Sequence, residues 1–379
     1  MRICLFTPNF LPDVGGAERT ADRVARGLME RGHQVMVLAQ YPSQRQPEPD
    51  LPYPVLRYRR PPRQNWWPGL LGRAVVKAHR RWPFEVMLAF YAYPTGYAGA
   101  QVKRRLNFGL VLTPRGGDLY PSFHGLKKWR VAHTIRAGYR AADRIATISS
   151  YTTERLHQFV GPPLPPLDVV PNGIDMNAHD ALLQASRDAT IPPLMDRPFV
   201  LHLARLSPVK QHGLALQAVE RLRDRFESLG VGYAIVGEGQ AMEQVQQFVR
   251  DRGLSSIVTL LGNRTGIEKA WLLDHARFLI STSREEGMPN VILEAMASGL
   301  PVLASDILPH RELIEDRGWG QLFRQGDAAD LTEKLNAMLS LELEAYRQQA
   351  LALRSRYTLD ATIDGFEKSL RAACHKSIG

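Results

Sequence analysis

The chain has 379 residues, of which 48 are lysine or arginine and 38 are aspartate or glutamate, so its formal net charge is +10. This length is sufficient for two domains with one hydrophobic core each. The two cysteines, Cys4 and Cys374, cannot make a disulfide framework, which indicates a reducing compartment. The sequence has no signal-peptide pattern and no apolar run of transmembrane length, so we expect a soluble or peripheral protein.

The charge is concentrated in the first half of the chain. Residues 1–180 contain 25 lysines and arginines against 13 acidic residues, whereas the remainder contains 23 and 25. A basic half indicates an acidic partner, which could be anionic lipid, nucleic acid or a phosphorylated substrate.

The chain begins with the pattern of a Rossmann-like half-unit. Residues 3–6 and 35–38 are predicted strands, and apolar residues at helical spacing between them predict a helix that closes near Gly32. The loop after the first strand contains Gly15 and Gly16, which Glu18 and Arg19 follow. A glycine pair after a strand is usually only a turn, and the dinucleotide-binding glycine motif is absent.

Residues 41–65 are rich in proline and arginine and are predicted to be irregular. No acidic residue occurs between Val55 and Trp82, and apolar residues at helical spacing follow Leu70. Basic residues beside tryptophans favour a membrane-surface element, while the alternative is a solvated basic helix whose tryptophans enter the core. The residues concerned are Arg57, Arg59, Arg60, Arg63, Arg73, Lys77, Arg80, Arg81, Trp66, Trp67 and Trp82.

Further strands are predicted at 86–89, 110–112 and 142–149. The second of these leads into a loop with Arg115 and Asp118, whose position after a strand favours a ligand-facing loop over a simple turn. Residues 176–197 are predicted to connect this domain to a second one.

The second α/β domain begins with a predicted strand at 199–204, which leads to Arg205 and Lys210. Basic residues just after a strand suit a diphosphate, although a surface pair is the simpler alternative. Residues 233–236 are another predicted strand, which ends at Gly237. Residues 342–379 are mostly helical in pattern.

The stretch 281–305 has the clearest pattern, a loop and a helix between predicted strands at 278–280 and 302–304. Glu286 and Glu294 would lie near the carboxyl end of the first strand, where open α/β sheets bind ligands. Gly287 permits close approach of the backbone to a ligand. Met288, Pro289 and Asn290 open the helix, whose first amides can hold a phosphate or a sugar oxygen.

These motifs together resemble the retaining nucleotide-sugar glycosyltransferases of the GT-B fold, family-four (group 1) type. The resemblance is carried by E-G-x-P-N followed by E-A-M-A-x-G-x-P-V at 286–302, by G-G-x-E-R at 15–19, by P-N-G-I-D at 171–175 and by R-L-x-x-x-K at 205–210. The sequence departs from the family at Arg115, where the T-x-H-G-x-D loop often has histidine. A cationic arginine cannot act as a base near neutral pH.

The resemblance implies an α/β fold of two Rossmann-like domains facing across a cleft (GT-B). The acceptor-side domain is expected over 1–178 and the nucleotide-sugar donor domain over 179–357. A C-terminal helix at about 358–379 is expected to pack back on the first domain.

The resemblance also implies a hexosyltransferase that moves a sugar, with retention of anomeric configuration, to a glycan or lipid-linked glycan. Its catalytic residues would be Glu286, Arg205 and Lys210. The donor would be bound by Gly15, Gly16, Gly237, Gly287, Met288, Pro289, Asn290 and Glu294. Glu18, Arg19, Arg115 and Asp118 would lie on the acceptor side or in the cleft.

No D-x-D motif is found, which favours catalysis without a metal or other cofactor, with the nucleotide-diphosphate sugar as co-substrate. We expect a cytoplasmic protein at the inner face of an anionic membrane, in the synthesis of bacterial surface polysaccharide or glycolipid. The alternatives are a nucleotide-sugar epimerase of the same fold and a non-catalytic protein that binds nucleic acid or nucleotide-sugar. No recognition-helix pattern or aromatic-basic repeat supports nucleic-acid binding.

Overall fold

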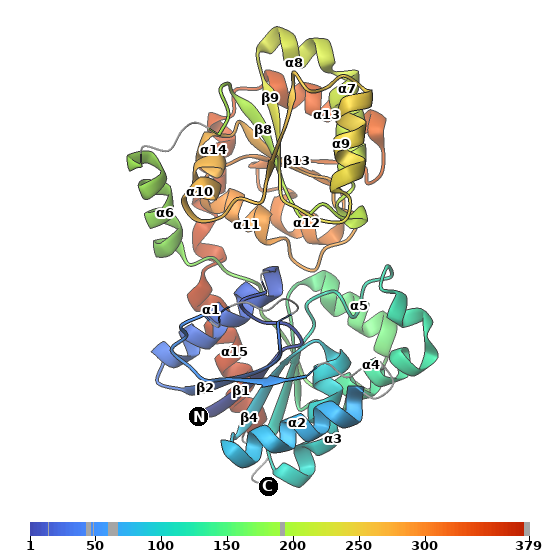
Figure 1. Cartoon of the computed structure of the whole chain (residues 1–379), viewed down its shortest axis with the longest axis vertical. Coiled ribbons are helices and arrows are strands. Elements are labelled where there is room, and N and C mark those ends of the chain that lie inside the picture. Colours follow the sequence, from blue (N-terminus) through green and yellow to red (C-terminus); the bar gives the residue numbers. More distant parts are fainter. Residues whose placement is uncertain (14, 43–46, 48, 60–66, 190–193, 375–379) are drawn as a thin grey trace. The chain divides into compact units, whose positions relative to one another are not determined.

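A computed structural model describes residues 1–379 except 14, 43–46, 48, 60–66, 190–193 and 375–379 (Figure 1). The chain divides into two compact units, residues 1–172 with 359–379, and residues 173–358. Within the described residues, no helix has both the length and the apolar character needed to cross a membrane.

The described part of the first unit is built on a seven-stranded parallel sheet in the order β3-β2-β1-β4-β5-β6-β7. Its strands are β1 (Arg2–Phe6), β2 (Gln34–Gln40), β3 (Val55–Tyr58), β4 (Val86–Phe90), β5 (Gly109–Thr113), β6 (Arg144–Thr147) and β7 (Leu167–Val169). Its helices are α1 (Gly16–Glu30), α2 (Trp67–Arg81), α3 (Tyr97–Leu106), α4 (Trp129–Ala141), α5 (Ser150–Val160) and α15 (Leu359–Cys374), with short helical segments at Ala92–Gly96 and His124–Lys127.

Successive side chains along a strand point to opposite faces of the first sheet, and both faces are covered by helices. In β1, Cys4 and Phe6 join the core beneath α2, α3, α4 and α5, whereas Ile3 and Leu5 join the core beneath α1 and α15. Because helices cover both faces, the inner strands β1, β2, β4 and β5 are apolar on both sides, and they read in the sequence as short continuous apolar runs.

The described part of the second unit contains a six-stranded parallel sheet in the order β10-β9-β8-β11-β12-β13. The strands are β8 (Phe199–Leu203), β9 (Gly232–Val236), β10 (Val258–Gly262), β11 (Phe278–Ser281), β12 (Val302–Ser305) and β13 (Gly320–Phe323). The helices are α6 (Met176–Asp188), α7 (His212–Arg221), α8 (Arg223–Leu229), α9 (Met242–Asp251), α10 (Gly266–His275), α11 (Asn290–Ala297), α12 (Leu308–Ile314), α13 (Ala328–Ser340) and α14 (Glu344–Ala352), with short helical segments at Pro208–Lys210 and Arg354–Arg356.

The two Rossmann-like units confirm the predicted fold class, but two local expectations were wrong. The stretch expected to be irregular contains β3, an edge strand that pairs in parallel with β2. The stretch expected to be a connection contains α6, whose first turn is capped by the Asp175 carboxylate accepting from the Ala178 amide at 2.9 Å.

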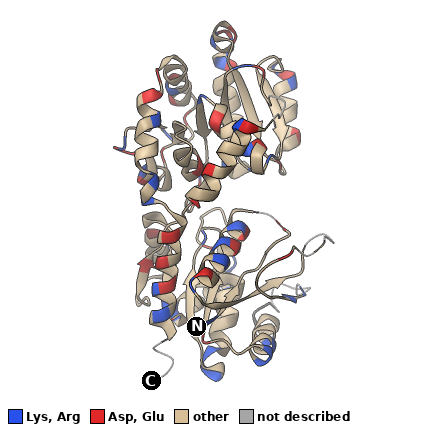
Figure 2. Cartoon of the chain, turned by 90° about the vertical axis from the view of Figure 1, so that its left-hand side faces the viewer, with Lys and Arg blue, Asp and Glu red and all other residues tan. Residues whose placement is uncertain are grey.

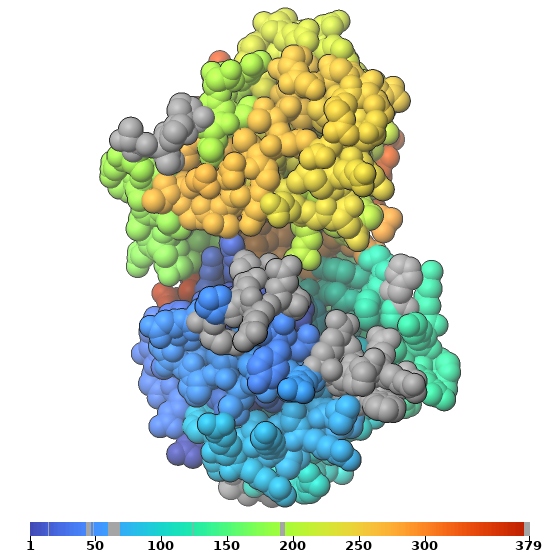
Figure 3. All heavy atoms as spheres, viewed as in Figure 1, coloured from blue at the N-terminus to red at the C-terminus, as the bar shows by residue number. Residues whose placement is uncertain are grey.

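The later part of the basic stretch, Trp67–Arg81, forms the surface helix α2, which in Figure 3 appears in light blue on the outside of the first unit. Leu71, Val75 and Ala78 are buried against the sheet, while Leu70 remains 37% exposed. Trp82 packs against the guanidinium of Arg2, 5.9 Å from the ring centre. Three residues of the predicted membrane element, Arg60, Arg63 and Trp66, lie outside the described residues, as does the side chain of Trp67.

Helix α15 completes the first unit, although it follows the second unit in the chain. Ile363, Phe366 and Leu370 are buried on the sheet beside α1. Figure 2 shows charges of both signs along this helix, and Arg31 at the end of α1 contacts the carboxylate of Glu367 at 3.1 Å.

Candidate functional site

The loops at the carboxyl ends of the second unit's strands are joined by backbone hydrogen bonds. The amide of Leu206 donates to the carbonyl of Glu238 at 2.9 Å, which links the loops after β8 and β9. The amide of Arg284 donates to the carbonyl of Val209 at 2.8 Å, which links the loops after β11 and β8. Side chains distant in the sequence therefore share one edge of the sheet, as expected for parallel strands.

Lys210 and Glu286 form an ion pair at this edge. The Ser283 hydroxyl donates to the same carboxylate oxygen, Oε1, at 2.8 Å, and the Thr282 hydroxyl donates to the carbonyl of Lys210 at 2.7 Å. The two charged side chains are 22% and 13% exposed. Burial opposes ionisation of Glu286, but attraction by Lys210 outweighs it and lowers the pKa of the carboxyl group.

His310 lies behind this pair and was not among the sequence candidates. Its side chain is fully buried, and its Nδ1 lies 2.7 Å from the carbonyl of Ser305, so that nitrogen carries the proton and donates it. The other ring nitrogen, Nε2, is buried without a hydrogen-bond partner among the described residues. Burial lowers the pKa of His310 to about 4 against the attraction of Glu286, so the ring is neutral near pH 7. No motif in the sequence marks this residue.

Arg205 stands on the same edge and is exposed. Within the part of the chain that the structure describes, no ion pair engages its guanidinium. The sheet edge therefore presents one paired cation and one exposed cation after β8.

Glu294 lies on α11, and its carboxylate accepts from Lys269 of α10 at 2.7 Å. Both side chains are mostly buried, at 13% and 17% exposed. Ser298, which directly follows α11, is hydrogen-bonded to His179 of α6 at 2.9 Å. The sequence motif identified Glu294 but not Lys269. The spacing of residues in α10 does not indicate which acidic side chain Lys269 contacts.

Gly237, at the end of β9, has a backbone conformation that side chains rarely adopt, with φ +136°. A Cβ atom there would lie 2.1 Å from the carbonyl oxygen of Ala204, so the position requires glycine. Because Gly237 crosses closely over the end of β8, it sets the distance between two strand-end loops.

Residues 287–290 lead from the β11 loop into α11. Gly287 is buried, and Met288 packs against the apolar core below α11. Pro289, expected in the first helical turn, is instead the residue before the helix, and Asn290 is the first helical residue. The amides of Ile292 and Leu293 bond the Pro289 carbonyl at 3.0 and 3.3 Å, so the hydrogen bonds of α11 begin at Pro289.

In the first unit, the glycine pair forms the start of α1. Gly15 is extended and precedes the helix, and Gly16 is its first residue and is exposed. Glu18 stands in the first turn, where a carboxylate is favoured by the helix dipole. The amide of Arg19 donates to the carbonyl of Gly15 at 3.1 Å.

Arg115 follows β5, near Glu18. Its Nη2 donates to the Asn172 side chain at 2.6 Å, and its guanidinium lies over the Phe90 ring at 5.0 Å. Burial lowers its pKa to about 10, while Tyr91, Tyr120 and Glu18 act in the opposite direction. Arg115 therefore stays cationic at neutral pH and cannot replace a basic histidine.

Asp118 has partners within the first unit. One carboxylate oxygen accepts from the Ala92 amide at 2.7 Å and from the Tyr139 hydroxyl at 2.8 Å, and the side chain is only 3% exposed. Burial raises its pKa to about 6. The other oxygen is buried without a hydrogen-bond partner in the described structure. The bond from Ala92 ties the loop after β5, which contains Asp118, to the segment after β4. Ligand contact by Asp118 stays a prediction.

Comparison with known proteins gives consistent matches. The family model "Glycosyltransferase Family 4" matches residues 14–178, and "Glycosyl transferases group 1" matches residues 197–340. The amylovoran biosynthesis glycosyltransferase AmsK of Erwinia amylovora is 33% identical over 277 residues, which is 69% of this chain and 63% of that protein. The GDP-mannose-dependent alpha-mannosyltransferase of Mycobacterium tuberculosis is 25% identical over 395 residues, 100% of this chain and 96% of that protein.

Solved structures share the fold. The Anabaena protein Alr3699/HepE, in complex with UDP, superposes with a TM-score of 0.77 at 21% identity, over 98% of this chain and 100% of that one.

Proposed function

The chain belongs to the family 4, group 1 glycosyltransferases, and from this premise we propose that it transfers a sugar from a nucleotide-diphosphate donor to a glycan or lipid-linked glycan, with retention of anomeric configuration. The second unit would bind the donor and the first unit the acceptor.

The observation that carries this proposal is the group of charges at the strand-end edge of the second unit. Two loops joined by backbone bonds bring Lys210 to Glu286, with Arg205 on the same edge. A pair fixed by burial and by surrounding hydrogen bonds needs little reorganisation when charge develops beside it.

The reaction requires stabilisation of a departing diphosphate. Arg205 can bond two phosphate oxygens through its planar guanidinium, and Lys210 supplies a point charge. The start of α11 adds amides that favour negative charge. The acceptor would attack the face that the leaving group departs from. Glu286 would lie beside the donor sugar, and Glu294 would hold the ribose.

The first experiment is a thermal-shift panel with UDP, GDP, ADP and TDP, because a ligand that binds only the folded state raises apparent stability. UDP and GDP are tested first, since HepE was solved with UDP and the mycobacterial relative is named for GDP-mannose. The preferred nucleotide then defines the sugar donors to assay. Equal shifts, or none, with all four nucleotides would contradict the donor site.

Incubation with the donor alone tests the main alternative. A transferase releases little product without an acceptor, whereas an epimerase converts the donor to a new sugar isomer. Formation of that isomer would replace the proposed reaction by epimerisation.

We propose that catalysis needs no metal, because the cations after β8 supply the charge that a divalent ion supplies in other glycosyltransferases. Activity is therefore expected to survive excess EDTA, while Arg205→Lys and Lys210→Ala each reduce it. A loss with EDTA that Mn²⁺ or Mg²⁺ restores would show that the charge was assigned to the wrong groups.

We further propose that the protein works at the cytoplasmic face of an anionic membrane, in the synthesis of surface polysaccharide or glycolipid. The excess of cations in residues 1–180 and their concentration on α2 support contact with anionic lipid. The name of the amylovoran relative places that protein in polysaccharide synthesis, which favours the same acceptor class here.

A further inference from the structure

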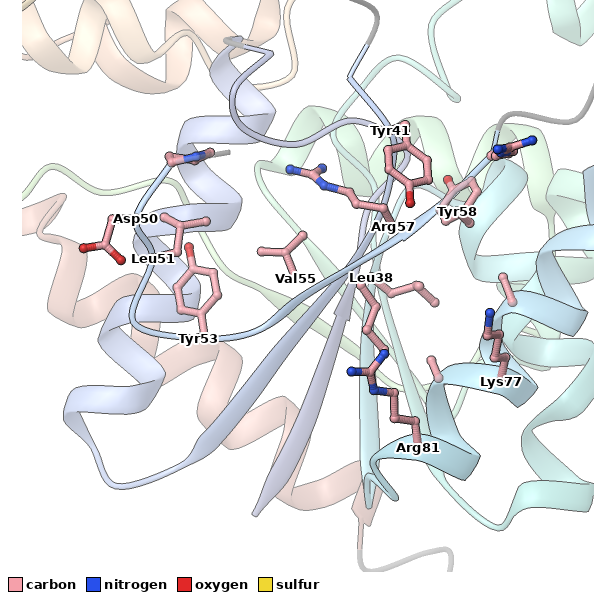
Figure 4. Close-up of a pocket in the computed structure, with 15 residues that line it drawn as sticks. Leu38, Tyr41, Asp50, Leu51, Tyr53, Val55, Arg57, Tyr58, Lys77 and Arg81 are labelled. Carbon is pink, nitrogen blue, oxygen red and sulfur yellow. The ribbon is translucent and has the colours of Figure 1, made fainter. Parts of the chain in front are cut away.

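A cavity of about 880 Å³ lies in the first unit at the edge strand β3, among residues to which the reaction proposed above assigns no part. Its lining comes from the end of β2, from β3 and the segment before it, and from α2, as Figure 4 shows. The volume falls in the upper part of the range usual for small-molecule sites.

The floor of the cavity is apolar. Leu38 of β2 and Ala78 of α2 are buried there, and Leu56 and Ala74 are partly buried beside them. Because β3 is the last strand of the sheet, no further strand covers its outer edge in the described structure. This floor suits a hydrocarbon chain.

The lining is also basic. Four cations, Arg57, Arg59, Lys77 and Arg81, take part in it against one carboxylate, Asp50. Figure 4 shows Asp50 at the opposite end of the cavity from Lys77 and Arg81, with β3 running between. Arg59, Lys77 and Arg81 are exposed. Arg59 directly follows β3, whereas Lys77 and Arg81 lie on α2, so the fold brings residues distant in the sequence to one cavity. The end near α2 is therefore complementary to a multiply charged anion.

We propose that this cavity binds the phosphate head and the adjoining apolar chain of an amphiphile. The apolar floor would hold the chain, and the exposed Arg59 and Arg81 would bond the phosphate oxygens through their planar guanidinium groups. A role for this site in holding a lipid-linked substrate rests on the proposed function, whereas the binding itself does not.

Dodecyl phosphate, below its micellar concentration, is the direct probe, and isothermal titration calorimetry gives its dissociation constant. Binding is expected to be at least about tenfold tighter than that of inorganic phosphate, which lacks the chain, or of dodecanoate, which lacks the phosphate. Dihexanoyl phosphatidylglycerol, a phosphate diester, distinguishes a bilayer phospholipid from a lipid monophosphate as the natural ligand. Preference for the diester indicates a bilayer phospholipid, preference for dodecyl phosphate indicates a lipid monophosphate, and either supports the site.

Helix α2 offers a matched control. Arg59→Ala/Arg81→Ala removes two exposed cations that line the cavity, whereas Arg73→Ala/Arg80→Ala removes two exposed cations that do not. The first variant is expected to weaken dodecyl phosphate at least about tenfold and the second by less than about twofold. Ala74→Trp, which fills the floor, is expected to abolish binding of the chain while thermal stability is retained.

Equal weakening by both double variants would show a general charge effect and overturn the proposal, as would equal affinity for dodecanoate. Nucleotide binding is measured in the same samples. Normal nucleotide binding with no dodecyl phosphate binding removes the cavity site alone, and the reverse result removes the proposed donor site alone.

Discussion

Glu286 balances Lys210, and Glu294 balances Lys269, so each carboxylate holds a cation in a mostly buried position. We expect Glu286→Ala and Glu294→Ala each to reduce turnover roughly tenfold to a hundredfold, because a charged hydrogen bond of about 1.5–3 kcal/mol is lost. Steady-state kinetics with the preferred donor measures the effect.

Glu285 is the matched control for these variants, since it is the neighbouring carboxylate of the same loop and has no assigned role. Glu285→Ala is expected to keep near-normal turnover. Circular dichroism and melting temperature establish that the variants remain folded. Near-normal turnover of both Glu286→Ala and Glu294→Ala would remove the site assignment.

Three buried histidines make the second unit sensitive to acid. The His202 and His212 rings stack with centres 4.2 Å apart, and burial lowers both pKa values, that of His212 to about 4 with a further contribution from Lys210. Burial also lowers the pKa of His310, to about 4. The unfolded chain therefore binds protons more readily than the folded one between about pH 6.5 and 4, and the free energy of unfolding falls across that window. His212 and His310 are each expected to cost roughly 1–2 kcal/mol at pH 5, and His202 acts in the same direction.

Hydrogen exchange at pH 7 and pH 5, corrected for intrinsic rates, measures this loss on peptides from 199–236. His212→Phe keeps a stacked ring without a titrating group and should reduce the pH dependence. In the first unit Asp118 has the opposite effect on stability: burial raises its pKa to about 6, so protonation at lower pH favours the folded state. Peptides from the first unit therefore provide an internal comparison. Unchanged protection of 199–236 at pH 5 would contradict the expectation.

For single residues, the sequence identified acidic and basic side chains of the candidate site but not all of their hydrogen-bond and ion-pair partners. The motif spacing pointed to Lys210 and Glu286, which the structure pairs. Lys269, His310 and the internal partners of Asp118 were not predicted, because they come from other elements and depend on how helices pack. Residue type and spacing give no information on such contacts.

The strand-end loops of the second unit depend on glycine geometry. Gly237→Ala would place a Cβ only 2.1 Å from the carbonyl oxygen of Ala204, at a φ of +136°. We expect the variant to lose more than about 1 kcal/mol of unfolding free energy and to weaken nucleotide binding, since the loops after β8 and β9 must separate. Urea unfolding and nucleotide titration measure the two effects.

Gly213→Ala is the control, because Gly213 lies in α7 with no atom within 4 Å of the added Cβ. This change should be neutral or should stabilise the protein by roughly 0.5–1 kcal/mol. If both glycine variants behave alike, the close crossing at Gly237 has no energetic role.

Elements with strong apolar patterns were predictable, and those at the periphery were not. The predictions at 278–280 and 302–304 are confirmed by β11 and β12 because buried parallel strands are continuous apolar runs. β3 was missed because an edge strand is only partly buried and here lies in a proline- and arginine-rich stretch. α6 was missed because the prolines at 192 and 193 and few strand-forming residues suggested a connection, and they say nothing about the helix before them.

The distribution of charge in the molecule predicts its behaviour on membranes. The protein should sediment with vesicles that contain phosphatidylglycerol but not with neutral phosphatidylcholine vesicles, and high salt should release it. Each cation near an anionic surface contributes about 1 kcal/mol, and salt screens this attraction.

A charge reversal of Arg73 and Arg80 to glutamate should reduce sedimentation strongly. The same reversal of Arg221 and Arg250, exposed on helices of the second unit, should have little effect. Equal sedimentation with neutral and anionic vesicles would exclude an electrostatic membrane contact.

The placement of α15 has a consequence for how the chain folds during synthesis. The apolar face of the first sheet needs Ile363, Phe366 and Leu370, yet all of residues 173–358 must be translated before these residues exist. At about 5–20 residues per second, that face stays partly uncovered for roughly ten to forty seconds on the ribosome. The second unit, which is contiguous, can fold within that interval. The first unit thus starts first and finishes last, and its uncovered face is the part of the nascent chain most in need of protection from aggregation.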